Sequence, residues 1–184
     1  MCIRDRSKEA AKKAIAIGRK YDTLLEVYFD GQGYAQKDEI AQVRKYHKNP
    51  NMWDYFLRTR IAVDSLEDLL DEKEGNLDKV QMLFADMEER EEAWKELERE
   101  GVFELVGSLQ YNIEINAVGV NKGTGLVNLG KMLGIRREEI MACGDGDNDI
   151  AMLKEVGFGV AMANAEEKVK AVADYITVSY THLR

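Results

Sequence analysis

The sequence predicts an α/β protein in which an α+β domain with an antiparallel sheet precedes a partial, doubly wound parallel sheet. The parallel sheet is predicted by residues 122–178, where helical segments and short apolar strands alternate strictly, as they do in doubly wound folds. The antiparallel sheet is predicted by paired β-prone runs that flank turn signals in the first part of the chain. The pattern changes after Val118, so we place a domain boundary there, between residues 1–118 and 119–178.

The composition excludes several classes of protein. A net charge of −8 over 184 residues argues against general nucleic-acid binding, which needs an excess of Lys and Arg to contact phosphates. No run approaches the roughly 18 apolar residues of a membrane span, and no apolar segment of a secretory signal follows the basic N-terminus. The two cysteines, Cys2 and Cys143, are far apart and form no disulfide framework, so the reducing cytoplasm is the expected location. The composition leaves the oligomeric state open.

The first part begins with a helix over residues 7–20 and a hairpin over 24–36. The dipeptide Asp30-Gly31 lies between two β-prone runs, and such a pair is a strong signal for a hairpin turn. His47 lies in a polar helical segment, so we expect it on the surface. The other predicted elements are helices at 38–47, 65–72 and 86–100, a helical turn at 51–57, and strands at 77–84, 102–108 and 111–117, with Ser65 and Asp86 as N-caps.

The second part begins with a helix over residues 122–134, in which Leu126, Leu129 and Leu133 share one face. Strands and helices then alternate to the end of the predicted sheet. The strands are expected at 140–143, 158–162 and 175–178, and the helices between them at 148–156 and 166–172. This order is typical of a parallel sheet whose strands are joined by helices.

The most informative segment is IMACGDGDNDIAML, residues 140–153. An apolar strand leads directly into it, and ligands of open α/β sheets bind beyond the carboxyl ends of the strands, where Asp145 is expected. Asn148 and Asp149 are expected in the first helical turn, whose free backbone N–H groups favour an anion. The carboxylates of Asp145, Asp147 and Asp149 repel one another unless a cation or hydrogen-bond donors compensate them. Hard oxygen ligands of this kind suit Mg²⁺.

Two other interpretations of this acidic segment agree less well with its residues. A turn with an N-cap and surface acids explains any one of the aspartates but explains the whole cluster poorly. A calcium-binding EF-hand loop fails because Ile150 occupies the position that needs Gly, and Val156 the position that needs Glu.

A second candidate residue is Lys122, within GVNKGTGL at residues 119–126. The segment is not a phosphate-binding Walker loop, because the GxxxxGK[ST] order is absent. A Lys at a helix start is slightly unfavourable against the helix dipole, and an isolated one is most often a surface residue. Because the acidic segment follows one helix and one strand later, Lys122 is interpreted as a cation that faces a phosphate.

These two segments together resemble motifs three and four of haloacid-dehalogenase-type (HAD) phosphatases of the Cof-like kind. The third motif is GVNKGTGL with Lys122, and the fourth is the GDxxND pattern of residues 144–149. The run that follows, GFGVAMANAEEKVKAVADYIT, is also similar to this family, and the resemblance covers residues 111–178. It implies that residues 119–178 are the C-terminal half of a Rossmann-like HAD core and that residues 1–118 form a cap domain of the C2B type.

The resemblance implies a Mg²⁺-dependent phosphatase acting on small phosphorylated metabolites such as sugar phosphates. In this family an Asp nucleophile forms an aspartyl-phosphate, and a second Asp acts as general acid and base. By this resemblance, Asp145 would bind Mg²⁺ directly, and Asp149 would hold the metal through water or orient the site. Lys122 would pair with the phosphoryl group and the nucleophile, and Asn148 would bind the phosphoryl oxygens. Asp147 occupies a variable place in the motif and receives no role.

The family's first motif, DxDGT, is not found in the 184 residues. The nearest string, at residues 28–32, lacks the second Asp and the Thr and falls in the predicted hairpin. The end strings MCIRDR and SYTHLR fit neither neighbouring element, so residues 1–6 and 179–184 are expected to be non-native. We therefore expect the chain to be a C-terminal fragment that is inactive by itself.

Two alternatives to the enzyme stay open. The chain could be a non-catalytic module that binds Mg²⁺ and phosphate or regulates a partner, which the absent first motif favours. It could also be a scaffold with an incidental acidic loop, whose stability would not depend on Mg²⁺.

Overall fold

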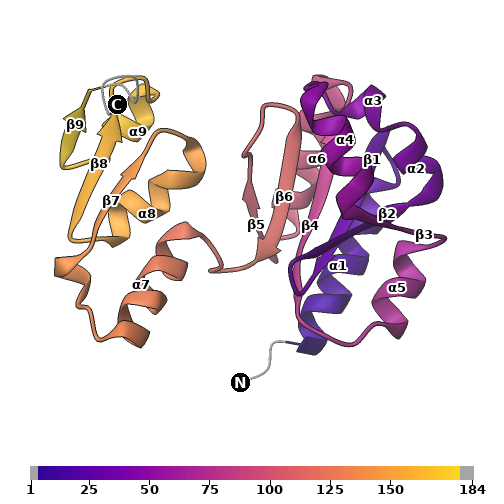
Figure 1. Ribbon diagram of the computed structural model, residues 1–184, viewed down its shortest axis with the longest axis horizontal. Helices are drawn as coiled ribbons and strands as arrows, with labels where there is room; N and C mark the ends of the chain where they lie inside the picture. Colours follow the sequence, from indigo (N-terminus) through magenta and orange to yellow (C-terminus); the bar gives the residue numbers. More distant parts are fainter. Residues whose placement is uncertain (1–3, 179–184) are drawn as a thin grey trace. The chain divides into compact units, whose positions relative to one another are not determined.

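The computed structural model describes residues 4–178 and divides the chain into two compact units, Met1–Val118 and Gly119–Arg184 (Figure 1). Helix α1 (Arg4–Gly18) includes residues 4–6, which the sequence did not place in the helix. The remaining residues of the expected non-native ends, 1–3 and 179–184, lie outside the described part, as does Cys2. Within residues 4–178, no helix combines the length and the apolar character needed to cross a membrane.

The first unit is built on a six-stranded sheet in the order β3-β2-β1-β4-β6-β5. All neighbouring strands are antiparallel except β2 and β3, which pair in parallel. The strands are β1 (Thr23–Phe29), β2 (Gln32–Gln36), β3 (Arg60–Val63), β4 (Leu77–Phe84), β5 (Phe103–Val106) and β6 (Asn112–Ala117). The predicted antiparallel α+β layer is confirmed, with β3 as an unexpected edge strand.

The hairpin turn between β1 and β2 forms where the sequence predicted it. Asp30 and Gly31 have φ angles of 47° and 79°, and two successive positive values are typical of the turn that matches the twist of a hairpin. The carboxylate of Asp30 accepts a hydrogen bond from the side chain of Asn76 at 3.0 Å, and the backbone N–H of Gly31 donates to Asp78 at 2.7 Å. These contacts tie the turn to the start of β4.

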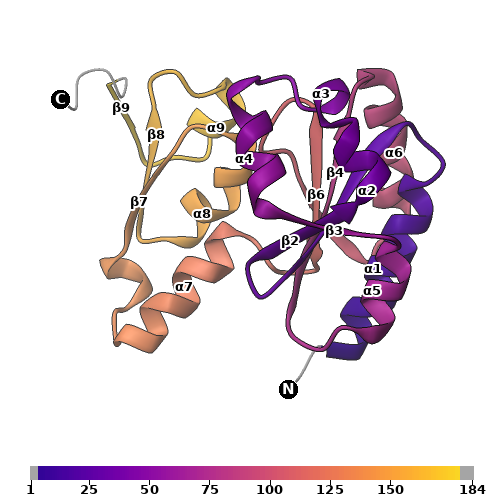
Figure 2. The same cartoon turned by 45° about the vertical axis from the view of Figure 1, so that its right-hand side comes forward.

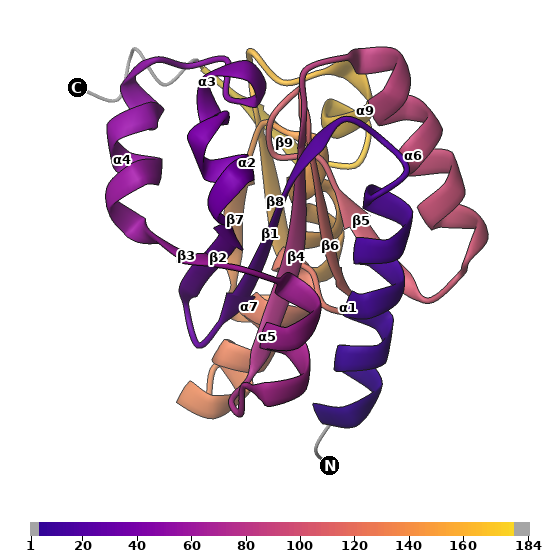
Figure 3. The same ribbon diagram turned by 90° about the vertical axis from the view of Figure 1, so that its right-hand side faces the viewer.

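Three helices cover one face of this sheet: α1, α5 (Leu66–Glu72) and α6 (Met87–Arg99) (Figure 3). The predicted caps are confirmed, since the side chains of Ser65 and Asp86 accept hydrogen bonds from Asp68 and Glu88. The buried core beneath these helices comes from alternate residues of the central strands and from one side of each helix. It includes Ile15, Leu25, Val27, Phe29, Leu66, Leu70, Met82, Phe84, Leu97 and Ile113.

Helices α2 (Lys37–Ala41), α3 (Val43–Tyr46) and α4 (Asn51–Thr59) cover part of the opposite face. Phe56 of α4 is buried there against Leu24 and Leu83. The expected single turn at 51–57 is thus a full helix, and β3 follows it directly. The four residues of β3 show no regular alternation of burial, which explains why their pattern did not predict a strand.

The prediction that His47 lies on the surface is wrong. His47 caps the end of α3 and is 6% exposed. Its Nδ1 lies 3.0 Å from the hydroxyl of Tyr111, and its carbonyl accepts a hydrogen bond from Trp53 at 2.8 Å. Tyr111 is distant in sequence, so the helical pattern around His47 could not reveal the contact. Burial lowers the pKa of His47, and the positive charge of Arg60 lowers it further.

Another buried polar group lies on the same face of the sheet. Glu26 is 0% exposed and forms an ion pair with Arg60. Its carboxylate also accepts hydrogen bonds from Tyr28 at 3.0 Å and from Gln81 at 3.1 Å. Burial raises the pKa of Glu26, and the charge of Arg60 opposes that rise. The guanidinium of Arg60 also lies 4.9 Å from the ring centroid of Phe56, so this network joins β1, β3, β4 and α4.

The second unit contains a parallel sheet in the order β7-β8-β9 (Figure 2). The strands are β7 (Met141–Gly144), β8 (Phe158–Met162) and β9 (Tyr175–Thr177). The intervening elements are α7 (Lys122–Leu133), η1 (Arg137–Glu139), η2 (Asp147–Asp149), α8 (Ile150–Glu155) and α9 (Glu167–Lys170). The predicted alternation and parallel pairing are confirmed.

The fully buried positions of helix α7 are glycines, while Leu126 is only half-buried. Gly123 and Gly130 are buried, and a Cβ at Gly123 would lie 2.7 Å from the carbonyl oxygen of Ala151 in α8. Leu129 and Leu133, by contrast, are largely exposed. The absence of a side chain at residue 123 therefore lets the backbones of α7 and α8 approach each other closely.

We expect Arg60→Met to lower the free energy of unfolding of the first unit by about 3–5 kcal/mol, because it leaves Glu26 buried without its partner. Denaturant unfolding can be followed by the fluorescence of Trp53 and Trp94, which both belong to this unit. Lys37→Met is the matched control, since it breaks an exposed ion pair with Asp64 and should cost at most about 1 kcal/mol. Equal losses for the two variants would contradict a stabilising role for the buried pair.

The lowered pKa of His47 predicts a loss of stability in mild acid. Its stabilising contribution is present above the ordinary value of 6.5, and it is lost as the pH falls through the lower value of the folded state. We expect the stability difference between the native protein and His47→Gln to become smaller, or to reverse, between about pH 7 and pH 5. Unfolding curves across this range measure the difference, and a constant difference would show that His47 does not titrate differently on folding.

Candidate active site

Lys122 is the first residue of α7, and the sequence around it fixes the start of that helix. The side chain of Asn121 accepts a hydrogen bond from the backbone of Thr124 at 3.0 Å. The hydroxyl of Thr124 in turn accepts one from the backbone of Asn121 at 3.1 Å. This reciprocal cap satisfies two backbone donors and sets the position of Lys122 at the end of the helix that faces α8.

The structure brings Lys122 to the acidic segment. Its ammonium Nζ lies 2.5 Å from Oδ1 of Asp149, although the two residues are 27 positions apart. The close approach of α7 and α8 at Gly123 allows this contact. The carboxylate also removes the unfavourable interaction of a Lys with the positive end of the helix dipole.

Asp149 binds the loop that precedes it. Its Oδ2 accepts hydrogen bonds from the backbone N–H groups of Asp145 at 2.9 Å and Gly146 at 3.1 Å, and its side chain is only 8% exposed. A Cβ at Gly144 would lie 2.4 Å from the Cβ of Asp149, so the tight loop requires glycine there. Burial alone would raise the pKa of Asp149, but the hydrogen bonds from Lys122, Gly146 and Asp145 outweigh it and lower the pKa.

Asp145 follows the carboxyl end of β7 and is half-buried. Its Oδ2 accepts a hydrogen bond from the side-chain amide of Asn164 at 3.2 Å. Its Oδ1 has no hydrogen-bond partner among the residues that the structure describes. Asp145 thus carries a carboxylate oxygen that is available to a ligand, and within residues 4–178 no cation pairs with this carboxylate, unlike that of Asp147.

Asn148 and Asp149 differ from the sequence-based expectation. Residues 147–149 form the 3-10 turn η2, and α8 begins only at Ile150, so Asn148 and Asp149 do not lie in the first turn of the helix. The N–H of Asp149 already donates to the carbonyl of Gly146 at 2.9 Å. Asn148 is half-buried beside the loop, and exposed Asp147 forms an ion pair with Lys168 at 2.6 Å.

Asn164 and Lys168 contact the acidic segment but were not identified as site residues from the sequence. Both belong to the segment that follows β8. Because β7 and β8 are adjacent and parallel, the residues after their carboxyl ends emerge at the same edge of the sheet. The polar residues that follow the second strand therefore indicate further site residues at this edge.

The metal-binding capacity of the site can be judged from its donors. In the described part of the chain, no group of three or more His, Cys, Asp or Glu side chains could hold a metal ion. Both oxygens of Asp149 are occupied by Lys122 and by backbone N–H groups, which suits an orienting role better than direct ligation. Asp145 remains as a single carboxylate ligand, and Mg²⁺ in proteins is often held by one or two carboxylates, waters and substrate phosphate.

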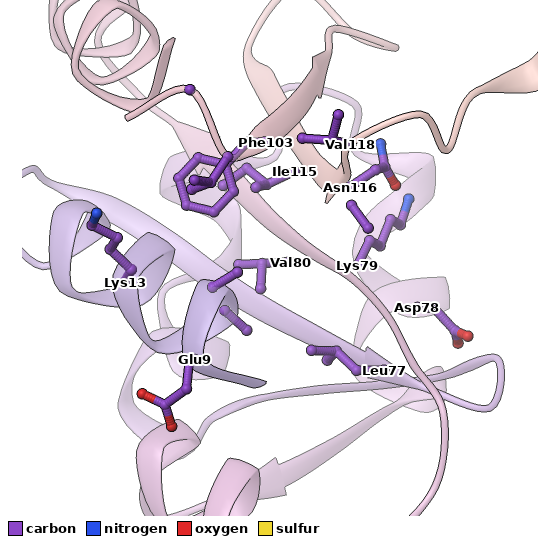
Figure 4. Close-up of a pocket in the computed structure, with 15 residues that line it drawn as sticks. Glu9, Lys13, Leu77, Asp78, Lys79, Val80, Phe103, Ile115, Asn116 and Val118 are labelled. Atoms are coloured by element: carbon purple, nitrogen blue, oxygen red, sulfur yellow. The ribbon is translucent and has the colours of Figure 1, made fainter. Parts of the chain in front are cut away.

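A separate cavity of about 780 Å³ lies within the first unit (Figure 4). Its wall includes apolar side chains of Val80, Phe103 and Ile115, and charged residues lie around it. Two of these charges are already compensated, since Lys13 pairs with Glu100 and Lys79 pairs with Glu114. None of the sequence-predicted site residues lines this cavity.

The family profile of haloacid dehalogenase-like hydrolases matches residues 3–182. The match extends over nearly the whole chain and includes both Lys122 and the acidic segment that contains Asp149. The chain therefore belongs to the haloacid dehalogenase-like hydrolase family, and the resemblance found in the sequence is confirmed.

Individual relatives agree with this assignment. The chain is 49% identical over 88 residues to the 5-amino-6-(5-phospho-D-ribitylamino)uracil phosphatase YcsE of Bacillus subtilis, an alignment that covers 48% of this chain and 35% of YcsE. Its fold is similar to a haloacid dehalogenase-like hydrolase from B. subtilis, with a TM-score of 0.75 and 25% identity over 93% of this chain and 66% of that one. It is also similar to the HAD subclass IIB sugar phosphatase BT4131, with a TM-score of 0.68 and 25% identity over 93% of this chain and 61% of that one. The chain thus spans about a third of YcsE and less than two thirds of these solved structures.

We expect Asp149→Asn to destabilise the second unit by roughly 1–3 kcal/mol, because an amide cannot accept hydrogen bonds on both sides and leaves donors unpaired. Faster amide hydrogen exchange in β7 and β8 would report the loss. Asp147→Asn is the matched control, because its ion pair with Lys168 is exposed and should contribute less than about 1 kcal/mol. If both variants exchange at the same rates, Asp149 does not hold the loop.

Proposed function

We propose that this chain supplies the Mg²⁺-binding and phosphate-binding part of a phosphomonoester hydrolase that acts on small phosphorylated metabolites. The contact that carries this proposal is the 2.5 Å pair between Lys122 and Asp149, whose carboxylate also holds the backbone of Asp145. The ammonium of Lys122 and the available oxygen of Asp145 are thereby both held at the loop that follows the carboxyl end of β7. Ligands of open α/β sheets bind at such ends, and membership of a hydrolase family supports the reaction class.

Each proposed role follows from the contacts of the side chain. Asp145 would hold Mg²⁺ through its available oxygen, and Asp149 would keep the loop and Lys122 in place. Lys122 is 49% exposed, so its ammonium can remain paired with Asp149 and still attract a phosphoryl group. Asn148 would donate its side-chain amide to a phosphoryl oxygen. When bound, Mg²⁺ would neutralise charge on the phosphoryl oxygens.

The proposed substrate class is a phosphorylated sugar or a similar polyol. YcsE is named for a substrate with a phosphorylated ribityl chain, and BT4131 is described as a sugar phosphatase. Both names combine a phosphate ester with a hydroxylated carbon chain, which supports this chemistry for the related site. With its expected reduced cysteines, the protein would act in the cytoplasm.

We also propose that the 184-residue polypeptide does not turn over phosphate esters by itself. Its sequence holds no DxDGT motif, and the nearest Asp-Gly pair forms the β1–β2 turn, where Asp30 bonds to Asn76. The polypeptide would then bind Mg²⁺ and phosphate without attacking phosphorus. This behaviour is also what the alternative of a non-catalytic binding module requires.

The test compares hydrolysis of p-nitrophenyl phosphate with binding of inorganic phosphate, each with and without Mg²⁺. We expect no turnover, together with phosphate binding that requires Mg²⁺ and is weakened at least about tenfold in Lys122→Met, since a charged hydrogen bond contributes roughly 1.5–3 kcal/mol. Arg136→Met is the control, because that Arg is exposed and pairs locally with Glu139. Turnover that disappears in Asp145→Ala would show that this chain contains its own nucleophile, and absence of phosphate binding would refute the proposed site.

A further inference from the structure

Asn164 joins the segment after β8 to the acidic loop after β7. Its side-chain amide Nδ2 donates to Oδ2 of Asp145 at 3.2 Å. The two strands pair in parallel up to Gly144 and Ala161, so the two connecting segments leave the sheet side by side. This hydrogen bond links two residues that are 19 positions apart.

The segment that carries Asn164 is held in place by buried neighbours and a backbone hydrogen bond. Its neighbours Met162 and Ala165 are buried, and the N–H of Ala165 donates to the carbonyl of Met162 at 2.9 Å. This tight turn leaves Asn164 exposed between two buried residues. Because the turn already fixes the backbone, only the side-chain rotamers of Asn164 have to be ordered when it forms its hydrogen bond.

A second bridge connects the same two segments. Lys168 of α9 donates to Asp147 at 2.6 Å and also lies 3.2 Å from Glu166. Val169, the next residue of α9, is buried in the core of the second unit. Asp147 is thereby compensated by a cation, which distinguishes it from Asp145, whose carboxylate pairs with no cation within residues 4–178.

We propose that Asn164 is a positioning residue that fixes the orientation of Asp145 for Mg²⁺, an inference that rests on the function proposed above. By occupying Oδ2, the amide restricts rotation of the carboxylate and leaves Oδ1 as the oxygen that meets the metal. Partners of this kind, which bind a metal ligand and not the metal, typically change metal affinity by about 10–100-fold when they are removed. Asn164 itself touches neither metal nor phosphate in this role.

A purely structural role for Asn164 predicts a different outcome. The residue is exposed and its side chain makes one hydrogen bond, so its removal should change stability by no more than about 0.5 kcal/mol. A loss of Mg²⁺ affinity without a loss of stability therefore identifies the positioning role.

The experiment measures Mg²⁺ affinity by isothermal titration calorimetry for the full 184-residue chain, Asn164→Ala and Asn128→Ala. Asn128 is an exposed residue of α7 and serves as the matched control. We expect the Mg²⁺ dissociation constant to rise at least about tenfold in Asn164→Ala and to stay unchanged in Asn128→Ala. The metal-free unfolding temperatures of all three proteins should agree.

The outcomes separate this inference from the proposed function. If the native chain binds Mg²⁺ and Asn164→Ala binds it equally well, the role of Asn164 is refuted and the proposed site stands. If the native chain binds no Mg²⁺, the proposed metal site is refuted and the role of Asn164 falls with it. The NMR resonances of the Asn164 side-chain amide provide a readout that needs no metal. We expect these resonances to shift in Asp145→Ala. Unchanged resonances would show that the hydrogen bond does not form in solution.

Discussion

The carboxylate of Asp149 accepts hydrogen bonds from two different parts of the second unit. One oxygen binds the ammonium of Lys122 at the start of α7, and the other binds two backbone N–H groups of the loop that follows β7. A buried carboxylate is costly unless its oxygens are paired, and here three donors offset that cost. The placement of the Lys122 ammonium and the backbone of the loop at Asp145 and Gly146 both depend on this one side chain.

The surrounding backbone is shaped to permit that interaction. Gly144 leaves room for the side chain of Asp149, and Gly123 lets α7 approach α8 until Lys122 reaches the carboxylate. In the first unit, the ion pair of Glu26 and Arg60 connects strands in a comparable way. In both units a buried charge is tolerated because several elements provide partners for it, and removal of one partner leaves the others without compensation.

Local sequence signals predicted much of this structure. The Asp30-Gly31 turn, the cap at Ser65 and the alternation after Val118 depend on residues close together in the chain, and the structure contains all three. Lys122 and Asp149 were both identified as site residues, and the structure brings them into contact, while their catalytic roles remain predictions. The approach of α7 to α8 needed a glycine whose purpose only the neighbouring helix reveals.

The features that were missed depend on distant partners. His47 is buried because Tyr111 covers it, and β3 is a strand because β2 provides its partner. Asn164 gains significance only because β7 and β8 end at the same edge. A helical pattern around His47 or a four-residue run such as RIAV contains no information about the partners of His47 and β3, so local reasoning could not recover those two features.

The packing of α7 also affects how its sequence can diverge. In an ordinary amphipathic helix the apolar positions are buried and change slowly, while the polar positions face water and change freely. In α7 the buried positions include the glycines, and Leu129, Met132 and Leu133 are exposed in the described structure. Within this unit, packing therefore excludes every side chain larger than hydrogen at residue 123. A comparison based on hydrophobicity alone would overlook the constraint at residue 123, because glycine carries no apolar side chain.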